Sequence, residues 1–587
     1  MTDSFKVIHV DLTTGRSQVL DIPGRNTWLG GSGLAAVLFE QFARMDELAD
    51  HPDQPLIFAI GPLTGFYPLM SKCVLGFMSP YHHQYAESHA GGRLALALRF
   101  AGYEALVVTG HAPTLSCLHV GARQVGIRDV HFMKGMDIFK TGKLLRTMYH
   151  KHSGHRSILR IGPAGENKVS FAAINVDTYR HFGRLGAGCA MGMKNLKAII
   201  VSGNKAQDIS AFKEYPKVYQ DIFQAITASE LMKKYHDLGT AENLNKLDRS
   251  GCLPWRNLKQ TSDPGSIKGI SGETFARDLL LRQTACAGCP VGCIHVGLLR
   301  EKFGPEHEFL YRQVAYDYEP IFAVGSMLGM GEASEVLTLL EDVERAGLDV
   351  MSAGVALAWA TEALEQSLIT TAETRVPLAF GHVGPYRQAL QLLSSPPNAF
   401  YSTLGQGTLH AAATYGGKDF ACVLGQEMAG YATGENFFVS QALGFRHSHL
   451  DTGAYAFDQQ QTSRDVSTAV SFLLEEERQR ILLCSMVACL FARKVYTPKR
   501  LHEALMALGL EEMTRDLEQK TTAIQAKRWN LRFRSGFDPR TVSIPKRFQQ
   551  VVTAKGPMDS TYMKELFNAY AGTLEAFRHQ DKPGSPA

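Results

Sequence analysis

Three cysteines lie close together in the segment ACAGCPVGCIH, at Cys286, Cys289 and Cys293. A C-x2-C-x3-C spacing presents three soft sulfur ligands on one short loop, and the glycines between them let the backbone wrap closely around a bound group. Zinc favours four ligands, commonly as two separated pairs, whereas a [4Fe–4S] cluster accepts three cysteines from one loop and a fourth from elsewhere. The spacing therefore favours an iron–sulfur cluster over a zinc ion and over three structural thiols.

The spacing does not identify the fourth ligand. Cys484 and Cys489 lie five residues apart in LLCSMVACLF, which we predict to be one helix, so their side chains should point in different directions and at most one should reach the cluster. The cysteines outside the triplet that qualify by residue type are Cys73, Cys117, Cys189, Cys252, Cys422, Cys484 and Cys489.

Length and composition limit the partners and the location of the protein. A chain of 587 residues is too long for one core, and ten cysteines without a secretion signal indicate thiols or metal ligands rather than a disulfide framework. The net charge is only +4, and no Lys/Arg-rich run is present, which argues against a nucleic-acid partner. No apolar stretch approaches the roughly 18 residues of a membrane helix. We therefore expect a cytoplasmic protein with no membrane span.

The elements that must position the cysteines change character along the chain. The first third contains short Val- and Ile-rich runs, KVIHVDL, PLIFAI, ALVVTG and KAIIVSG, separated by glycine-dense turns, which are typical of strands. Beyond about residue 210 the pattern becomes helical; in SEVLTLLEDVERAGLD an apolar stripe formed by Val336, Leu337, Leu340 and Val343 ends at Gly347.

These patterns predict an α+β fold with a β-rich N-terminal domain followed by two mainly helical domains. We expect the boundaries to be 1–208 for the β-rich domain, 209–400 for a helical domain that carries the cysteine loop, and 401–587 for a helical C-terminal domain.

Several segments resemble the aldehyde:ferredoxin oxidoreductase family, in the family's order and over nearly the whole chain: IFAIGPLTG, AGYEALVVTG, IGPAGENKVSFAAIN, GRLGAGCAMGMKNLKAIIVSG and the cysteine triplet. Members of this family are tungsten, occasionally molybdenum, enzymes with a bis-pterin cofactor beside one [4Fe–4S] cluster. The resemblance implies that the β-rich domain binds the pterin. It also implies that Cys489, in CSMVACLF, is the fourth cluster ligand, so that the cluster spans a domain boundary.

The resemblance also assigns a cofactor-binding set. Glycine-rich turns offer backbone N–H groups to the pterin phosphate and let the chain approach a flat ring. By resemblance, the residues that contact the pterin, or a magnesium ion that bridges its phosphates, are Lys72, His89, Arg180, Gly183, Arg184, Gly186, Glu344, Asp349 and Cys484.

Four residues of this set depart from the family pattern. Lys72 stands for an Arg and lacks its bidentate fork, and His89 stands for a magnesium-contacting Asn although imidazole is a poor ligand for a hard cation. Glu344 and Cys484 each stand for an Asp, and a thiol is a weak substitute for a carboxylate. The departures indicate that one pterin is held differently, that the alignment is shifted by a few residues, or that the chain is a divergent branch with altered chemistry.

Two further residues are expected to act on the substrate. Glu319, in YDYEPIFAVG, and His449, in FRHSHLDTG, align with an active-site glutamate and histidine of the family. A Glu and a His beside a high-valent metal could deprotonate an attacking water, and we expect burial to raise the pKa of the Glu.

The sequence therefore predicts a tungsten or molybdenum bis-pterin oxidoreductase that oxidises an aldehyde or related carbonyl compound. Electrons would leave through the [4Fe–4S] cluster to ferredoxin or a partner iron–sulfur subunit, and the family implies a homodimer or a heteromeric complex. The alternatives are an aromatic acyl-thioester reductase of the same family and a pterin-free iron–sulfur electron-transfer subunit.

Overall fold

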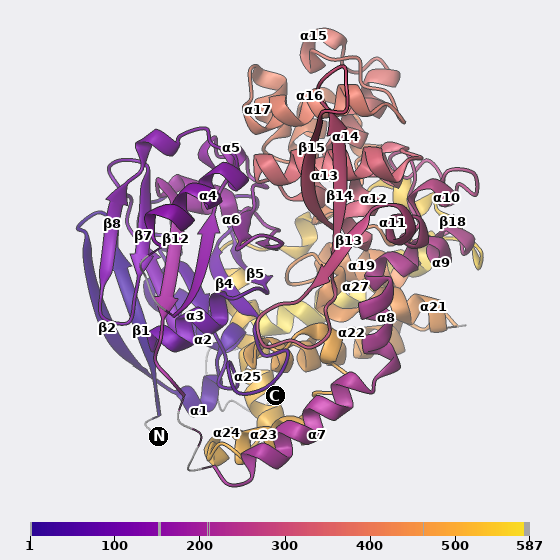
Figure 1. Ribbon diagram of the computed structural model, residues 1–587. Coiled ribbons are helices and arrows are strands. Elements are labelled where there is room, and N and C mark those ends of the chain that lie inside the picture. The colour runs from indigo at the N-terminus through magenta and orange to yellow at the C-terminus, as the bar shows by residue number, and fades with distance from the viewer. Residues whose placement is uncertain (1–2, 151–153, 208, 210–211, 462, 580–587) are drawn as a thin grey trace.

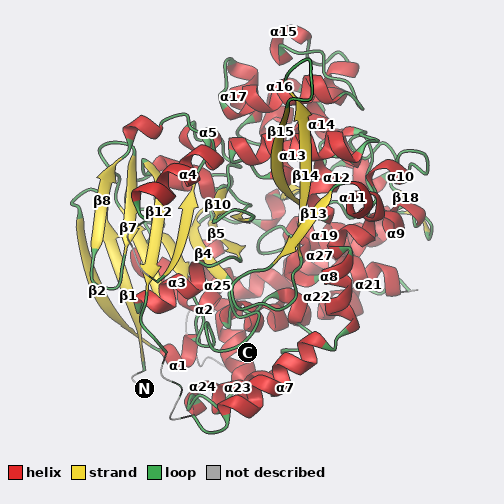
Figure 2. Cartoon of the chain, in the orientation of Figure 1, coloured by secondary structure: helices red, strands yellow, loops and turns green. Residues whose placement is uncertain are grey.

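The computed structural model describes residues 3–150, 154–207, 209, 212–461 and 463–579. Strands are concentrated in the first 203 residues and helices in the remainder (Figure 2), which confirms the expected α+β class. The boundary expected after residue 208 falls beside residues outside the described ranges, and the division into three domains stays a prediction.

The N-terminal part contains two six-stranded sheets. The first has the order β2-β1-β6-β3-β4-β5, in which only β1 and β6 pair in parallel. Its strands are β1 (Ser4–Asp11), β2 (Arg16–Pro23), β3 (Leu56–Ala59), β4 (Cys73–Met78), β5 (Tyr85–Ala90) and β6 (Ala105–Thr109). The second has the order β11-β10-β9-β12-β7-β8. Its strands are β7 (Ser116–Val120), β8 (Val125–Asp129), β9 (His155–Arg160), β10 (Ile174–Val176), β11 (Arg180–Phe182) and β12 (Leu196–Gly203).

Both faces of the first sheet are buried, because successive side chains along each strand point to opposite faces and pack into two different cores. Ile8 shares a core with Val201 of the second sheet, while its neighbour Val7 belongs to a second core that includes Leu34 of α2 (Gly31–Phe42). Because successive strand side chains point to opposite faces, an unbroken apolar run can serve both cores. The four Val- and Ile-rich runs are strands, as expected.

Helices form most of the rest of the chain and lie beside and below the two sheets (Figure 1). Many of their buried side chains belong to the same core as Val7 and Leu34. The stripe expected near residue 340 is confirmed, because α13 buries Val336, Leu337, Leu340 and Val343 and is closed by Gly347 at a φ of 73°. The longer helices are α7 (Tyr215–Thr227), α13 (Ala333–Ala346), α14 (Val350–Glu365), α22 (Val466–Ser485), α25 (Leu517–Arg534) and α27 (Ser560–Glu575).

A three-stranded antiparallel sheet interrupts the region that the sequence predicted as helical. It consists of β13 (Leu280–Thr284), β14 (Ile294–Lys302) and β15 (Phe309–Tyr316) in that order. Its strands contain apolar residues, as in FLYRQVAY of β15, but several of these side chains, including Leu281, Leu310 and Tyr311, are exposed and so do not mark a regular buried face. The loop between β13 and β14, residues 285–293, carries the three clustered cysteines.

The helices within the described residues include none with the length and apolar character needed to cross a membrane.

Candidate functional site

The cysteine loop is held by backbone hydrogen bonds to two distant parts of the chain. Ala287 N donates to Gly92 O at 3.1 Å, and Leu69 N donates to Gly288 O at 3.2 Å. Leu69 in turn accepts a bond of 2.9 Å from Cys489 N. The hairpin loop, the N-terminal domain and the segment after α22 therefore meet at one place.

The four cysteines nominated for the cluster face one another across this meeting point. Cys289, Cys293 and Cys489 pack beside the same apolar core, and the charges of Cys286, Cys293 and Cys489 all act on Cys289. All four are partly exposed, unlike the other six cysteines, which are buried. Among the described residues no group of three His, Cys, Asp or Glu side chains is placed to hold a metal ion. Each cysteine of a [4Fe–4S] cluster binds a different iron, so the cluster does not require such a compact group.

The N-terminal domain approaches the thiols closely at a glycine. A Cβ atom on Gly91 would lie 2.6 Å from Cys286 Sγ and 3.2 Å from Lys72 Nζ, so no larger residue fits there without movement. Gly91 is the last residue before the Gly92 carbonyl that holds the loop.

Two partly buried cations face the thiols. Arg180 Nη2 lies 3.7 Å from Cys293 Sγ, and Lys72 lies close enough for Cys489 and Cys286 to raise its pKa against the effect of burial. Burial alone would raise the pKa of Cys286, but Arg180 and Lys72 together lower it. Cationic surroundings of this kind stabilise the thiolate form that metals bind. The structure thus places Lys72 and Arg180, both expected at the pterin, beside the cysteines.

The expectation that Cys484 and Cys489 share one helix is wrong. Helix α22 ends at Ser485, and Val487 adopts a left-handed φ of 57°. The chain therefore turns before Cys489, which lies outside the helix and bonds to Leu69 through its backbone. A β-branched residue at positive φ is rare, which is why the turn was not predicted.

Glu319 and His449 lie in contact. His449 Nε2 is 3.1 Å from Glu319 Oε1, and the Tyr431 hydroxyl donates to the same oxygen at 2.8 Å. His449 Nδ1 is buried and has no hydrogen-bond partner among the described residues. Glu319 lies in the first turn of α12 (Tyr318–Val324), and His449 opens α20 (His449–Thr452) behind a capping box formed by Ser448.

The pKa expected for Glu319 has the wrong sign. Burial does act to raise the pKa of Glu319, but the hydrogen bonds with His449 and Tyr431 outweigh it and lower the pKa. Burial and the neighbouring Glu319 instead raise the pKa of Asp317 to about 7. Two adjacent carboxyl groups whose pKa values are pushed apart are a common arrangement for acid–base chemistry.

Asp317 was not predicted as a site residue. It occupies the N-cap position of α12, but its side chain does not cap the helix, and its Oδ1 is buried without a hydrogen-bond partner in the described part of the chain. Arg180 and His181 are close enough to lower its pKa in part. The acidic pair in YDYE was the available signal, since Asp317 and Glu319 stand two residues apart.

Arg184 links the glycine-rich segment to a buried carboxylate group. Its Nε donates to Asp349 Oδ2 at 3.2 Å and its Nη2 donates to Glu427 O at 2.7 Å. Asp349 also caps α14, accepting from Met351 N and Ser352 N. Glu427, fully buried and not predicted, accepts from Ser352 Oγ at 2.8 Å.

The glycines of this segment permit close approach. Gly186 precedes α6 (Ala187–Met193) at a φ of 84°, and a Cβ there would lie 2.3 Å from Ser170 O. At Gly183 the nearest atom to such a Cβ is His181 Cβ at 3.9 Å, so the backbone is open on that side. Glu344 lies nearby, with His181 Nε2 at 2.8 Å from its Oε2.

His89 and Cys484, two departures from the family pattern, are neighbours. His89 Nε2 is 3.2 Å from Glu87 Oε2, and its Nδ1 is 3.2 Å from Arg446 Nη1. Burial disfavours both the Cys484 thiolate and the His89 imidazolium. The attraction between these two charged forms outweighs burial, so the pKa of Cys484 is lowered and the pKa of His89 is raised. Arg446 also bonds Asp451 at 2.7 Å, two residues beyond His449. Arg446 was missed because no local motif marks it.

The donor chemistry fits the cofactors that the resemblance implies. Four thiols with two facing cations suit an iron–sulfur cluster, and arginine and open glycine backbone suit the phosphates and flat rings of a pterin.

Comparison with known proteins supports the same assignment. Residues 7–203 match the N-terminal domain of aldehyde ferredoxin oxidoreductase, and residues 217–574 match its domains 2 and 3. The tungsten-containing aldehyde ferredoxin oxidoreductase of Pyrococcus furiosus is 29% identical over 610 residues, covering 96% of this chain and 95% of that protein. The Pyrococcus abyssi protein of the same name is 31% identical over 443 residues, covering 73% of this chain and 70% of its own.

A solved structure shares the fold. It is the active-site complex BamBC of benzoyl coenzyme A reductase with 1,5-dienoyl-CoA, which superposes with a TM-score of 0.80 at 18% identity and covers 97% of this chain and 95% of its own. The two domain matches together span most of the 587 residues. The chain therefore belongs to the aldehyde ferredoxin oxidoreductase family and is an oxidoreductase of that type.

Proposed function

We propose that this protein oxidises an aldehyde to a carboxylic acid and passes the electrons through a [4Fe–4S] cluster to ferredoxin or to a partner iron–sulfur subunit. Family membership implies a tungsten pterin cofactor and an iron–sulfur cluster. The observation that carries the proposal is the contact of 3.1 Å between His449 Nε2 and Glu319 Oε1, with Tyr431 on the same oxygen.

The proposed reaction balances in atoms and in charge. One aldehyde and one water give one carboxylic acid, two protons and two electrons. When bound, the tungsten pterin provides the electron acceptor for the aldehyde, and the cluster provides a one-electron exit. Glu319 is ionised at neutral pH because its pKa is lowered, so its carboxylate accepts a proton from the attacking water.

His449 and Tyr431 position this base. Both bond Oε1 of Glu319, which fixes the carboxylate and leaves His449 Nδ1 buried and available for a hydrogen bond to substrate. Asp317, whose pKa is raised to about 7 by burial and by the neighbouring Glu319, is proposed as the next proton acceptor.

The cofactors would be held at two places. Cys286, Cys289, Cys293 and Cys489 would hold the cluster, with Lys72 and Arg180 balancing its charge. Gly183, Arg184, Gly186, Glu344 and Asp349 would hold the pterin, and His89 and Cys484 would form a second group of contacts to it. The cytoplasmic location expected from the sequence stays a prediction.

The test begins with composition. Anaerobically purified protein should contain about four irons with tungsten or molybdenum and pterin, and should reduce a viologen dye when given an aldehyde. Iron without pterin would instead support an electron-transfer subunit. Oxidation of no aldehyde, together with reduction of an aromatic acyl thioester, would support the reductase alternative.

A further inference from the structure

The cysteine loop lies at the molecular surface. Ala285, Gly288 and Pro290 are exposed, while the cysteines between them are partly buried. The loop crosses the front of the molecule in Figure 1, below strand β13. Any group held by these cysteines is therefore close to solvent on this face.

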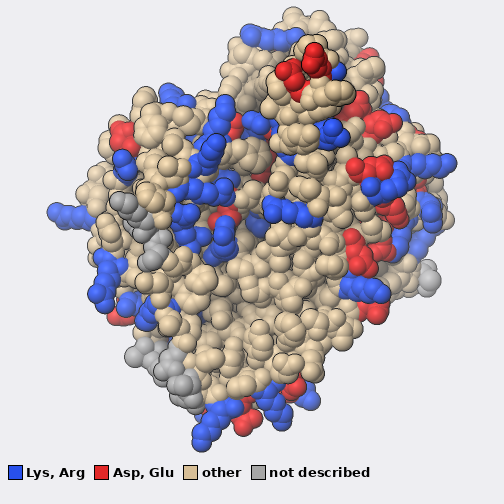
Figure 3. Space-filling model, viewed as in Figure 1, with Lys and Arg blue, Asp and Glu red and all other residues tan. Residues whose placement is uncertain are grey.

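A basic pocket opens beside the loop. It has a volume of about 260 Å³ and is lined by Arg93, Arg146, His150, Gly154, His155, Arg156, Ile158 and Asp177. Figure 3 shows Lys and Arg side chains gathered on this face, around the hollow between the N-terminal domain and strands β13–β15.

The positive charge of this pocket is largely unneutralised. Asp177 is its only lining carboxylate, and it pairs with Arg93 at 3.6 Å. Arg146 donates instead to Thr178 Oγ1 and Arg156 to Tyr149 O, so neither has a carboxylate within salt-bridge distance in the described ranges. Burial and the charges of Arg146 and Arg93 lower the pKa of Arg156, and Asp177 offsets this only in part.

The pocket is joined to the cysteine loop through two residues. Gly92, whose carbonyl accepts from Ala287 N, immediately precedes Arg93, whose side chain lines the pocket. Gly91 abuts Cys286 Sγ. The basic side chains therefore begin one residue from the backbone that holds the cluster loop.

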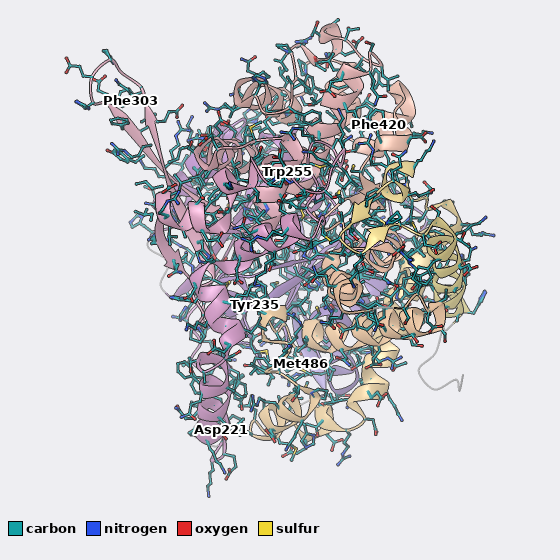
Figure 4. All side chains as sticks on the ribbon, turned by 90° about the vertical axis from the view of Figure 1, so that its right-hand side faces the viewer. Asp221, Tyr235, Trp255, Phe303, Phe420 and Met486 are labelled. Carbon is teal, nitrogen blue, oxygen red and sulfur yellow. The ribbon has the colours of Figure 1, made fainter. Side chains whose placement is uncertain are left out.

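Exposed apolar side chains lie on the three-stranded sheet that carries the loop. Phe303 and Tyr311 are each 61% exposed on the β14–β15 hairpin, and Leu281 on β13 is 44% exposed. Figure 4 shows Phe303 at the tip of this projecting hairpin and Asp221 on α7, which projects on the same side of the molecule. Exposed large apolar side chains in a projecting element are typical of protein–protein interfaces.

We propose that this face, formed by the cysteine loop, Arg93, Arg146, Arg156 and the β14–β15 hairpin, is the docking surface for an acidic iron–sulfur electron carrier. The inference rests on the proposed function, since it names where the electron acceptor binds. An acidic carrier is favoured by charge complementarity, which steers encounter and fixes orientation. A second copy of this chain is disfavoured, because a two-fold contact through the same face would bring the arginines of both copies together.

The experiment compares the holoenzyme with a charge-reversed double variant, Arg146→Glu with Arg156→Glu. A purified acidic [4Fe–4S] ferredoxin is the probe, and its affinity is measured by titration at 50 and 300 mM salt. We expect the double variant to bind about tenfold more weakly at low salt and to lose most of the salt dependence. The aldehyde-dependent rate with a viologen dye should stay within about twofold, because a small dye does not need the surface.

Three matched variants sharpen the result. Arg146→Lys with Arg156→Lys should bind ferredoxin almost as the wild type does, because the charge is kept. Arg249→Glu, an exposed residue at the end of α9 (Asn243–Arg249), should also leave binding unchanged. Phe303→Ala with Tyr311→Ala should weaken binding severalfold without altering its salt dependence.

The outcomes separate the two proposals. Unchanged ferredoxin affinity in both the arginine and the hairpin variants would overturn the proposed docking surface. It would also be overturned if light scattering showed that these variants change the oligomeric state of the protein while ferredoxin binding stays the same. If the wild-type holoenzyme shows no aldehyde-dependent reduction of the dye, the proposed function is wrong. The ferredoxin titration would still test the docking surface in that case. If the double arginine variant does not fold, the ferredoxin affinity of the hairpin variant tests the docking surface instead.

Discussion

The residues expected to hold the cluster lie together in the structure, whereas the residues expected to bind the pterin lie in several separate groups. All four nominated cysteines meet at one point, held by backbone bonds among three chain segments. The nine residues nominated for the pterin instead fall into separate contacts: Arg184 with Asp349, Glu344 with His181, His89 beside Cys484, and Lys72 with Arg180 at the cysteines.

The difference reflects how each set is specified. Three cluster ligands lie within eight residues, so one loop conformation gathers them and only one distant partner remains to be found. The pterin contacts are spread over more than 400 residues, and each depends on the packing of a different element. A short motif therefore constrains its site much more tightly than a dispersed set does.

Removing a cysteine should give the largest effect. Cys489→Ala should reduce the iron content well below four per chain and abolish electron transfer to ferredoxin, because the cluster would lose its fourth cysteine ligand. Iron analysis and electron paramagnetic resonance of the reduced protein measure this directly. Cys422→Ser is the matched control, since Cys422 is buried and its thiol donates to Asn257 O. Full iron in the Cys489 variant would show that the fourth ligand was assigned wrongly.

Glu319→Gln should come next. The isosteric amide keeps the contacts of Glu319 but cannot accept a proton, so kcat with an aldehyde should fall by about 10²–10³-fold. The iron and pterin contents should not change. A fall in pterin content equal to the fall in rate would assign Glu319 to cofactor binding instead.

Arg184→Lys should have a smaller effect. Lysine lacks the planar fork with which Arg184 spans Asp349 and the Glu427 carbonyl, so pterin per chain should fall by about threefold to tenfold while iron is kept. Released pterin is measured on the same sample as the iron. Arg16→Lys, at an exposed position on β2, should leave both contents unchanged. Wild-type pterin in the Arg184 variant would remove this residue from the binding set.

Asp317→Asn should give the smallest effect, in the pH dependence of stability. Burial and Glu319 raise the pKa of Asp317 to about 7, so its protonated form stabilises the fold at low pH and this contribution is lost as pH rises from about 4 through 7. The variant should therefore match the wild-type Tm near pH 4 and exceed it by about 1–3 °C at pH 8. A constant difference in Tm from pH 5 to pH 8 would contradict the raised pKa.

Much of the fold could be predicted because local patterns carried it. The Val- and Ile-rich runs became β1, β3, β6 and β12, and the apolar stripe before Gly347 became α13. The sheet β13–β15 was missed because several of its apolar side chains, such as Leu281, Leu310 and Tyr311, are exposed and form no regular buried face. The helix predicted through Cys489 was wrong because Val487 takes a backbone conformation that no side-chain pattern announces.

The site shows the same limit at the level of single residues. Glu319 and His449 were chosen from separate motifs, but only the packing of α12 against the segment around His449 showed them in contact and made Tyr431 their third member. The sign of the pKa shift of Glu319 also depended on these partners. Burial was foreseeable, whereas two hydrogen bonds to one oxygen were not.

The sequence by itself determined the α+β class, the family and the three clustered thiols, because strand alternation, helical periodicity and motif spacing act over a few residues. Only the tertiary structure decided that Gly91, Lys72 and Arg180 line the thiols, that Asp317 takes the raised pKa, and that arginines and an apolar hairpin flank the same loop. Those properties depend on distances between groups far apart in the chain, and packing alone sets such distances.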